Sequence, residues 1–360
     1  MRRFGLVFLL GFWIFFLPEE VFSQSFNFNT KPRGIDLPVQ NILDIEQDTL
    51  GQLWFSTSRG VVYSDGIYTH NLPDTLVRKF SYRIAILKDP DGKIWLYNAT
   101  GTPNLFRGTE NSWIEEKIEL IDPEVISDRN SFFSLQRGNL TLFLLDTQQG
   151  LIFWEKGGTK QRLENTRLDY GHLLHASVID SEFVLNFEKA TMTFDQEKLR
   201  EVNWKGVPLP SPPVQITPSP AGDSYYFLGK NYLYRGMEPF FPTELIDEGI
   251  GAYDFSEEPF FGMQFSGNAL FYHFNSQLRK YSPGRNQIFR IDLFPLFQTP
   301  LLQTFMVDQE GILWLGSSRG LASNNSQIFQ NYSSRETGFL GNEVTAIHEI
   351  AQGSYLLGFN

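Results

Sequence analysis

The sequence predicts an all-β fold, a β-propeller of seven four-stranded blades with the start of a further repeat at its C-terminus. One observation is a motif, D-x-x-G-x-[LI]-W-[FL]-x-x-x-x-G, that begins at Asp48, Asp89 and Asp308. Weaker copies repeat its tryptophan position about every 43 residues, a period that suits helical repeats or propeller blades. A second observation favours blades, because each unit consists of short runs rich in Val, Ile, Phe, Tyr and Trp that are separated by Gly, Asp and Asn. Four short strands per unit, stacked radially, make a propeller.

The N-terminus has the layout of a secretory signal. Arg2 and Arg3 precede an apolar run over residues 4–17, which is short for a membrane span of about 20 residues. We expect a signal peptide over residues 1–23, with a retained anchor as the alternative. The propeller is then expected over residues 24–335 and the start of a next repeat over residues 336–360, in a chain exported to the periplasm.

The segment "SFNFN", residues 25–29, follows the expected signal. It alternates apolar and polar residues, as a half-buried strand does. We expect it to pair with the last blade, because this pairing would close the ring and hide the edges of its sheets.

Each motif position has an expected structural role. The Asp and the first glycine form the turn between the first and second strands, where Asp caps its own backbone and Gly takes a positive φ. The Trp fills the wedge between blades, and the second glycine turns the second strand into the third; sugar stacking on the tryptophans is the alternative. The twelve positions are Asp48, Gly51, Trp54, Gly60, Asp89, Gly92, Trp95, Gly101, Asp308, Gly311, Trp314 and Gly320.

The weaker copies are assigned by spacing. The residue six positions before the second glycine, or before the residue in its place, takes the tryptophan position. In the sixth unit this glycine is Gly267. The assigned residues are Leu144, Val184, Tyr226 and Phe261.

Ser318 raises the question of an esterase, because residues 316–320 fit G-x-S-x-G. A nucleophile elbow requires a strand, a strained turn and a helix. The residues after Gly320 have no helical period, and the other motif copies carry Ser58 and Ala99 at the position of Ser318. We therefore interpret Ser318 as a variable residue of a repeat turn and predict no catalytic residue.

The residues from Asp48 to Gly66 resemble the two-component regulator propeller repeat. The resemblance is strong over residues 38–105 and 300–330 and weak between them. It implies the periplasmic sensor region of a histidine kinase or hybrid two-component sensor. In that family two seven-bladed propellers commonly precede a Tyr-rich domain, a membrane helix and the kinase. This chain is expected to be a fragment or a shortened gene product, with a membrane link and histidine kinase activity only through missing segments. Any homodimer would form through the propeller or through the missing domains.

Composition limits the other functions. The chain has no cysteine, and its net charge is −11 with no basic cluster, which argues against nucleic acid and anionic membranes as partners. His172 and His175 lack a third metal ligand nearby, so we expect loop or strand-edge histidines. Residues 89–92 fit a turn better than a calcium loop. We predict no metal site and no cofactor.

Arg59 and Arg319 are the candidate ligand-binding residues. Each precedes a second glycine, in a turn expected on the face where ligands enter a propeller channel, and a guanidinium there could hold a carboxylate, a sulfate or sugar hydroxyls. A solvated turn residue is the alternative. The predicted function is an extracytoplasmic ligand-sensing propeller that binds an oligosaccharide or a polar small molecule and catalyses nothing. A polysaccharide lyase, a glycosidase or a purely structural, protein-binding propeller are the alternatives. A glycosidase needs two carboxylates converging at the channel, whereas the conspicuous ones here lie in repeat turns.

Overall fold

The computed structural model describes residues 28–324, except 33, 81–82, 110–111, 123, 250–261, 275–276 and 300, together with residues 344–351 and 354–359. The expected signal peptide and the expected boundaries at 23/24 and 335/336 lie outside these residues.

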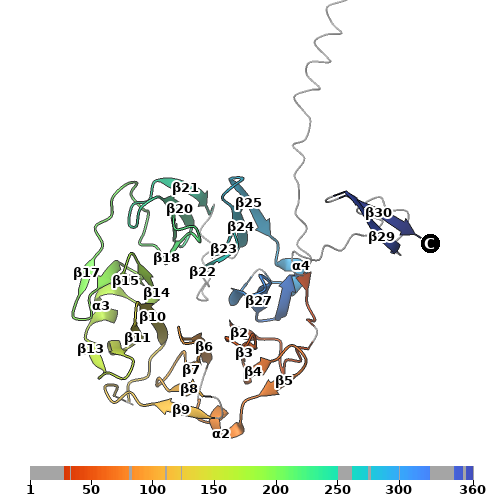
Figure 1. Ribbon diagram of the computed structural model, residues 1–360. Coiled ribbons are helices and arrows are strands. Elements are labelled where there is room, and N and C mark those ends of the chain that lie inside the picture. The colour runs from red at the N-terminus through yellow and green to blue at the C-terminus, as the bar shows by residue number, and fades with distance from the viewer. Residues whose placement is uncertain are drawn as a thin grey trace, which may run out of the picture.

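Seven four-stranded antiparallel sheets form a ring, which confirms the predicted seven-bladed propeller (Figure 1). In each of the first six blades the strands follow chain order. Blades 1 to 3 consist of β2 (Ile42–Gln47), β3 (Leu53–Thr57), β4 (Gly60–Ser64) and β5 (Thr69–Asn71); β6 (Ile84–Lys88), β7 (Ile94–Asn98), β8 (Leu105–Gly108) and β9 (Trp113–Glu116); and β10 (Ser131–Arg137), β11 (Leu140–Thr147), β12 (Gly150–Glu155) and β13 (Gln161–Leu163).

The remaining blades repeat this plan. Blades 4 to 6 consist of β14 (Leu173–Ile179), β15 (Glu182–Phe187), β16 (Thr191–Phe194) and β17 (Leu199–Glu201); β18 (Gln215–Pro218), β19 (Tyr225–Leu228), β20 (Tyr232–Gly236) and β21 (Glu244–Glu248); and β22 (Gly262–Ser266), β23 (Ala269–Phe274), β24 (Gln277–Ser282) and β25 (Gln287–Ile291). Blade 7 consists of β26 (Thr304–Val307), β27 (Leu313–Ser317), β28 (Gly320–Asn324) and β1 (Phe28–Asn29). A separate two-stranded sheet, β29 (Val344–Ala351) with β30 (Ser354–Phe359), lies where a further repeat is expected to start.

The pairing of β1 with β28 closes the ring. Phe28 lies opposite Asn324 and Asn29 opposite Ser323, in antiparallel register. The predicted closure is therefore confirmed for these two residues of the 25–29 segment. The N-terminal strand β1 forms the outer strand of blade 7 and covers the edge of β28.

The strand order gives the ring two distinct faces. Successive strands are antiparallel, so the turns between second and third strands lie on the same face as the connections between blades; we call this the mouth face. The short helices α2 (Asp74–Val77), α3 (Thr166–Tyr170) and α4 (Phe294–Phe297) belong to these connections. The opposite face carries the Asp-x-x-Gly turns, and we call it the motif face.

The motif aspartates hold both a turn and a tryptophan. Asp48 Oδ1 accepts hydrogen bonds from the backbone N–H groups of Leu50 and Gln52, and Gly51 has a φ of +82°. These contacts confirm the predicted turn. In addition, Asp48 Oδ2 accepts the indole N–H of Trp54 at 3.0 Å, and the same bond recurs from Trp95 to Asp89 at 2.9 Å and from Trp314 to Asp308 at 2.8 Å.

The motif tryptophans belong to the core between blades. Trp54, Trp95 and Trp314 are 8%, 2% and 6% exposed. Each packs against apolar residues of the following blade; Trp54, for example, joins a cluster with Ile84 and Phe106. The predicted wedge role is confirmed, and the burial argues against a sugar-stacking role.

The second glycine has two forms. Gly60 and Gly320 begin the third strands of their blades, with φ values of +117° and +151°. Gly101 lies, as expected, in the connection between the second and third strands of blade 2 and has a φ of +80°, but this connection is longer and Gly101 forms an isolated bridge with Ser127 in it. The following Pro103 has no N–H to donate, so β8 starts only at residue 105.

The assignment for the sixth unit is wrong. Gly267 lies in the turn between β22 and β23, the first and second strands, and Phe261 is outside the described residues. The strand pairing instead puts Phe271 at the tryptophan position, three residues before the end of β23, as Trp54 is three residues before the end of β3.

Side chains bridge the inner strands of neighbouring blades. The amide of Gln215 accepts from the backbone N–H of Met263 at 2.8 Å and donates to its carbonyl at 2.9 Å. Gln264 makes the same pair of bonds to Val307 on the next blade, at 2.9 and 3.1 Å. These bonds satisfy backbone groups at the inner edges of the sheets, which strands cannot pair at the axis of a ring.

Candidate functional site

The predicted arginines lie in exposed turns of neighbouring blades. Arg59 is in the β3–β4 turn of blade 1 and Arg319 in the β27–β28 turn of blade 7, both on the mouth face. Their backbone N–H groups donate to Thr57 Oγ1 and Ser317 Oγ, which fixes the turns. Neither guanidinium group has a hydrogen bond or ion pair with a residue that the structure describes. The predicted location is confirmed, and ligand binding by these groups remains a prediction.

Ser318 occupies the same exposed turn as Arg319. The turn leads directly into β28, a strand, and not into a helix. The arrangement that activates a serine at a nucleophile elbow is therefore missing at this position.

Replacing Ser318 with alanine is expected to change the free energy of unfolding by less than about 0.5 kcal/mol, as for ordinary surface substitutions. The folded wild-type protein is expected not to react with a fluorophosphonate probe, as measured by intact-mass spectrometry. Labelling that disappears in the alanine variant would contradict the interpretation of Ser318 as a turn residue.

The central channel contains a cavity of about 490 Å³ lined by the inner strands of several blades. Asp44 and Glu46, two residues apart on β2, both line it, together with Lys88 and His175. Burial raises the pKa of Asp44 to about 6, although the hydrogen bond from the Ile86 N–H and the positive charge of Arg83 both lower it. Burial, followed by repulsion from Asp44, raises the pKa of Glu46 to about 7.

These two carboxylates correct the expectation that the notable acids lie only in repeat turns. The alternation in residues 42–47, "ILDIEQ", is the signal that would have placed them side by side on one strand. Asp44 already accepts bonds from the backbone N–H groups of Ile45 and Ile86 at 3.0 and 2.9 Å. Glu46 also interacts with a backbone N–H group, that of Gln47.

The two histidines have different environments. His175 lies on β14 and lines the channel, where burial lowers its pKa to about 4. His172 lies in the connection that precedes β14. Within the described ranges, no group of three or more His, Asp or Glu side chains is arranged to hold a metal ion.

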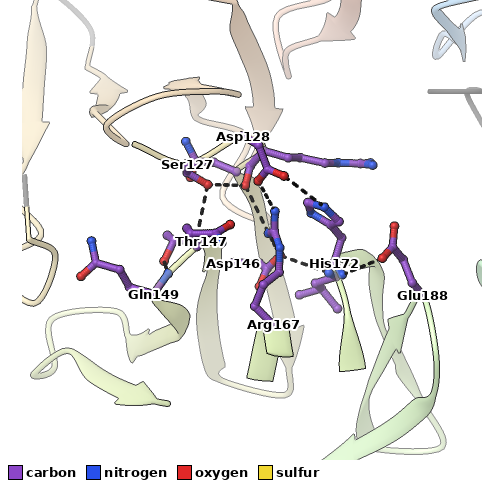
Figure 2. A network of polar contacts seen from close by, with 12 residues as sticks. Ser127, Asp128, Asp146, Thr147, Gln149, Arg167, His172 and Glu188 are labelled. Atoms are coloured by element: carbon purple, nitrogen blue, oxygen red, sulfur yellow. Dashed lines mark hydrogen bonds and ion pairs between the residues drawn. The ribbon is translucent and has the colours of Figure 1, made fainter. Parts of the chain in front are cut away.

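A polar network on the mouth face joins blades 3 and 4 (Figure 2). At its centre, Arg167 of α3 donates from Nη1 to Asp146 Oδ2 at 3.0 Å, and Asp146 is fully buried. Asp146 Oδ2 also accepts the N–H of Leu173, the first residue of β14, at 3.1 Å. Burial raises the pKa of Asp146 to about 6, although Arg167 and the Leu173 N–H oppose this shift.

The residue at the position equivalent to Asp146 also links consecutive blades elsewhere in the ring. Ser56 of blade 1 donates to the carbonyl of Ile84, and Asn186 of blade 4 donates to the carbonyl of Pro213 at 3.0 Å. In each case a polar side chain near the end of the second strand holds the start of the next blade. In blade 3 the residue is a carboxylate, which accepts an N–H of the next blade where the other two donate to a carbonyl, and Arg167 balances its charge.

A second hollow lies between blades 1 and 2. This cleft of about 900 Å³ is lined by Trp54, Tyr63 and Trp113, with Lys79 and Lys93 among its polar residues. The rings of Trp54 and Tyr63 stack with their centroids 4.6 Å apart. The cleft is large enough for a small ligand, and the sequence reasoning did not anticipate it.

Comparisons with known proteins identify the fold. No family model matches the sequence, and no curated protein matches it. No helix in the described part of the chain has the length and apolar character needed to cross a membrane.

Among solved structures, the chain is similar to the extracellular domain of a putative hybrid two-component system from B. thetaiotaomicron. The TM-score is 0.63 at 15% identity, over 84% of this chain and 41% of that one. It is also similar to the extracellular domain of a putative one-component system from the same organism, with a TM-score of 0.60 at 13% identity over 91% and 44%. A streptogramin B lyase gives 0.59 at 14%, over 83% and 98%. The chain spans less than half of each sensor domain. Sensor domains and a lyase are thus both similar in fold to this chain, and the likeness shows the fold alone.

Proposed function

We propose that the chain is an extracytoplasmic ligand-sensing propeller, the input part of a two-component sensor, and catalyses nothing itself. The observation that carries the proposal is the likeness of its ring to extracellular domains of such systems, together with the secretory signal expected over residues 1–23. The same two observations support a periplasmic location as part of the proposal.

The mouth face is the proposed recognition surface. Loops there are held by rigid blades, an arrangement that suits binding because loop residues can vary while the scaffold stays fixed. Arg59 and Arg319 offer exposed guanidinium groups for an acidic or polar ligand such as an oligosaccharide. In a sensor, the ligand must bind more tightly to one of two arrangements, and downstream domains then report the change.

A propeller lyase or glycosidase is the second candidate. The channel carboxylates Asp44 and Glu46 favour it, as does the overlap with nearly the whole streptogramin B lyase. Both carboxylate oxygens of Asp44 already accept backbone N–H groups, and this argues against two carboxylates that are both free to act in catalysis. A purely structural or protein-binding ring is the third reading, and it predicts no small-molecule ligand.

The test is a calorimetric screen of residues 24–360 against neutral and acidic oligosaccharides. For a ligand that binds, Arg59→Ala and Arg319→Ala are each expected to weaken binding at least about tenfold, because each removes a charge-assisted hydrogen bond. Arg285→Ala, which removes an exposed arginine from the motif face, is the matched control and is expected to leave affinity unchanged.

Two outcomes would contradict these expectations. Unchanged affinity in both variants would exclude the two arginines from the site. Cleavage or β-elimination of a bound glycan, detected by mass spectrometry, would overturn the statement that the chain is not an enzyme.

A further inference from the structure

We propose that Arg167 and His172 form a binding site for a small anion, a carboxylate or another oxyanion, which Asp128 of the same chain occupies in this structure (Figure 2). This inference goes beyond the proposed function, because it places an anion site at the junction of blades 3 and 4, away from Arg59 and Arg319.

The guanidinium of Arg167 is fixed before any ligand arrives. Its Nη1 donates to the buried Asp146 at 3.0 Å and to the carbonyl of Arg129 at 3.3 Å. The side chain is only 10% exposed, so these bonds hold the group in one orientation. Its Nη2 remains directed at the mouth face, where it meets Asp128 Oδ1 at 2.5 Å.

His172 supplies the second contact to the same carboxylate. Its Nε2 lies 3.9 Å from Asp128 Oδ2, so each oxygen of one carboxylate faces one nitrogen-bearing group. The histidine backbone N–H donates to Glu188 Oε2 at 3.3 Å, which positions the residue at the start of blade 4. An oxyanion in place of the Asp128 carboxylate would accept a charge-assisted hydrogen bond from Arg167 Nη2 and would have the imidazole of His172 beside it.

Asp128 is suited to exchange with a ligand, unlike Asp146. Its side chain is 69% exposed, whereas that of Asp146 is fully buried. Because Asp128 faces solvent, an external anion can replace its carboxylate at Arg167 Nη2. Asp146 stays in place and keeps the guanidinium oriented.

The release of Asp128 would change a short and well-defined part of the mouth face. Ser127 is held from one side, since Gln148 N–H donates to its Oγ. Asn130 is held from the other, since its Nδ2 donates to the carbonyls of Asn98 and Gly101. Asp128 lies between these anchors, and the carbonyl of Arg129 stays bound by Ser127 Oγ at 2.7 Å and by Arg167 Nη1. Anion binding would therefore be converted into a movement of Asp128.

The experiment compares anion affinities by isothermal titration calorimetry, with succinate, sulfate and phosphate as probes. Asp128→Asn empties the site of its internal carboxylate, and we expect it to bind at least one probe about tenfold more tightly than the wild type does. Asp169→Asn is the matched control. Asp169 is exposed and lies on α3, the helix that carries Arg167, so its substitution removes an equal charge close to the site without removing a contact of Arg167. The control is expected to bind as the wild type does.

A second variant tests the histidine. His172→Gln in the Asp128→Asn background is expected to return the affinity most of the way to the wild-type value. Equal affinities of the wild type, Asp128→Asn and Asp169→Asn would overturn the proposal, as would an equal gain in both aspartate variants, which would indicate a general charge effect. Failure here leaves the proposed sensing function unaffected, because Arg59 and Arg319 take no part in this comparison.

Discussion

Trp95→Ala is expected to lower the free energy of unfolding by about 3–5 kcal/mol, the range for truncating a buried aromatic side chain. The indole ring is 2% exposed and packs between blades 2 and 3, with centroids 5.3 Å from Phe132 and 5.1 Å from Phe143. Its loss leaves a cavity at a blade interface. It also leaves Asp89 Oδ2, the acceptor of the indole N–H at 2.9 Å, without its donor.

The measurement is urea-induced unfolding followed by circular dichroism. Trp54→Ala serves as the comparison, and its loss is expected near the lower end of the range, because Trp54 borders the cleft between blades 1 and 2 and water can fill the space left behind. A loss below about 1 kcal/mol for Trp95→Ala would contradict the wedge role of the motif tryptophan.

Arg167→Ala is expected to destabilise the ring by about 3–5 kcal/mol at pH 7.5, because removal of one partner of a buried ion pair leaves the other charge uncompensated. The partner, Asp146, is fully buried and holds the first residue of blade 4. The folded-state pKa of Asp146, about 6, already lies above the ordinary value of 3.8, and loss of Arg167 would raise it further. A folded state that binds more protons than the unfolded state becomes less stable as pH rises, so the deficit of the variant should shrink between pH 7.5 and pH 5.

Protonation of His172 is also expected to reduce the stability deficit of Arg167→Ala at low pH. Burial first, and then the Arg167 charge, lower its pKa, against the opposing effects of Glu188 and Asp128; Arg129 adds to the lowering. Removal of Arg167 therefore favours its protonation at pH 5. The control is Asp146→Asn combined with Arg167→Ala. The double variant is expected to be more stable than Arg167→Ala alone at pH 7.5, since the amide oxygen of an asparagine can accept the N–H of Leu173 without carrying a charge. A deficit that is independent of pH, with no rescue by the second substitution, would show that Arg167 acts through packing alone.

The architecture was predictable because its determinants are local. Asp48, Gly51 and Trp54 lie within seven residues of each other, and one turn with one indole bond explains their spacing. The spacing also placed Leu144, Val184 and Tyr226 on the second strands of blades 3 to 5, and it failed only in blade 6. The turn after β22 contains Gly267, and counting from that glycine put the sixth unit one strand too early.

The candidate site was less predictable, because it is assembled across blades. Arg59 and Arg319 were located correctly since each sits inside a recognisable repeat. Asp128, Asp146 and Arg167 come from three different segments, and nothing local in any of them indicates that the other two are near. The channel pair Asp44 and Glu46 did have a local signal, the alternation within β2, and it was overlooked in favour of the more conspicuous turn aspartates.

The two-residue pairing of β1 with β28 determines how the ring responds to a pulling force. Phe28, the first residue of β1, lies opposite Asn324, the last residue of β28, so the chain on either side of the ring departs from the same end of the two-residue ladder. Tension applied between those two departing segments would peel the ladder open one residue pair at a time, and would not load both pairs together in shear. Such a joint yields to a small force, while the six blades that are formed from consecutive strands carry none of it. The ring would therefore open at blade 7 first, and a pulling experiment with handles at residues 28 and 324 should show one low-force event before any blade unravels.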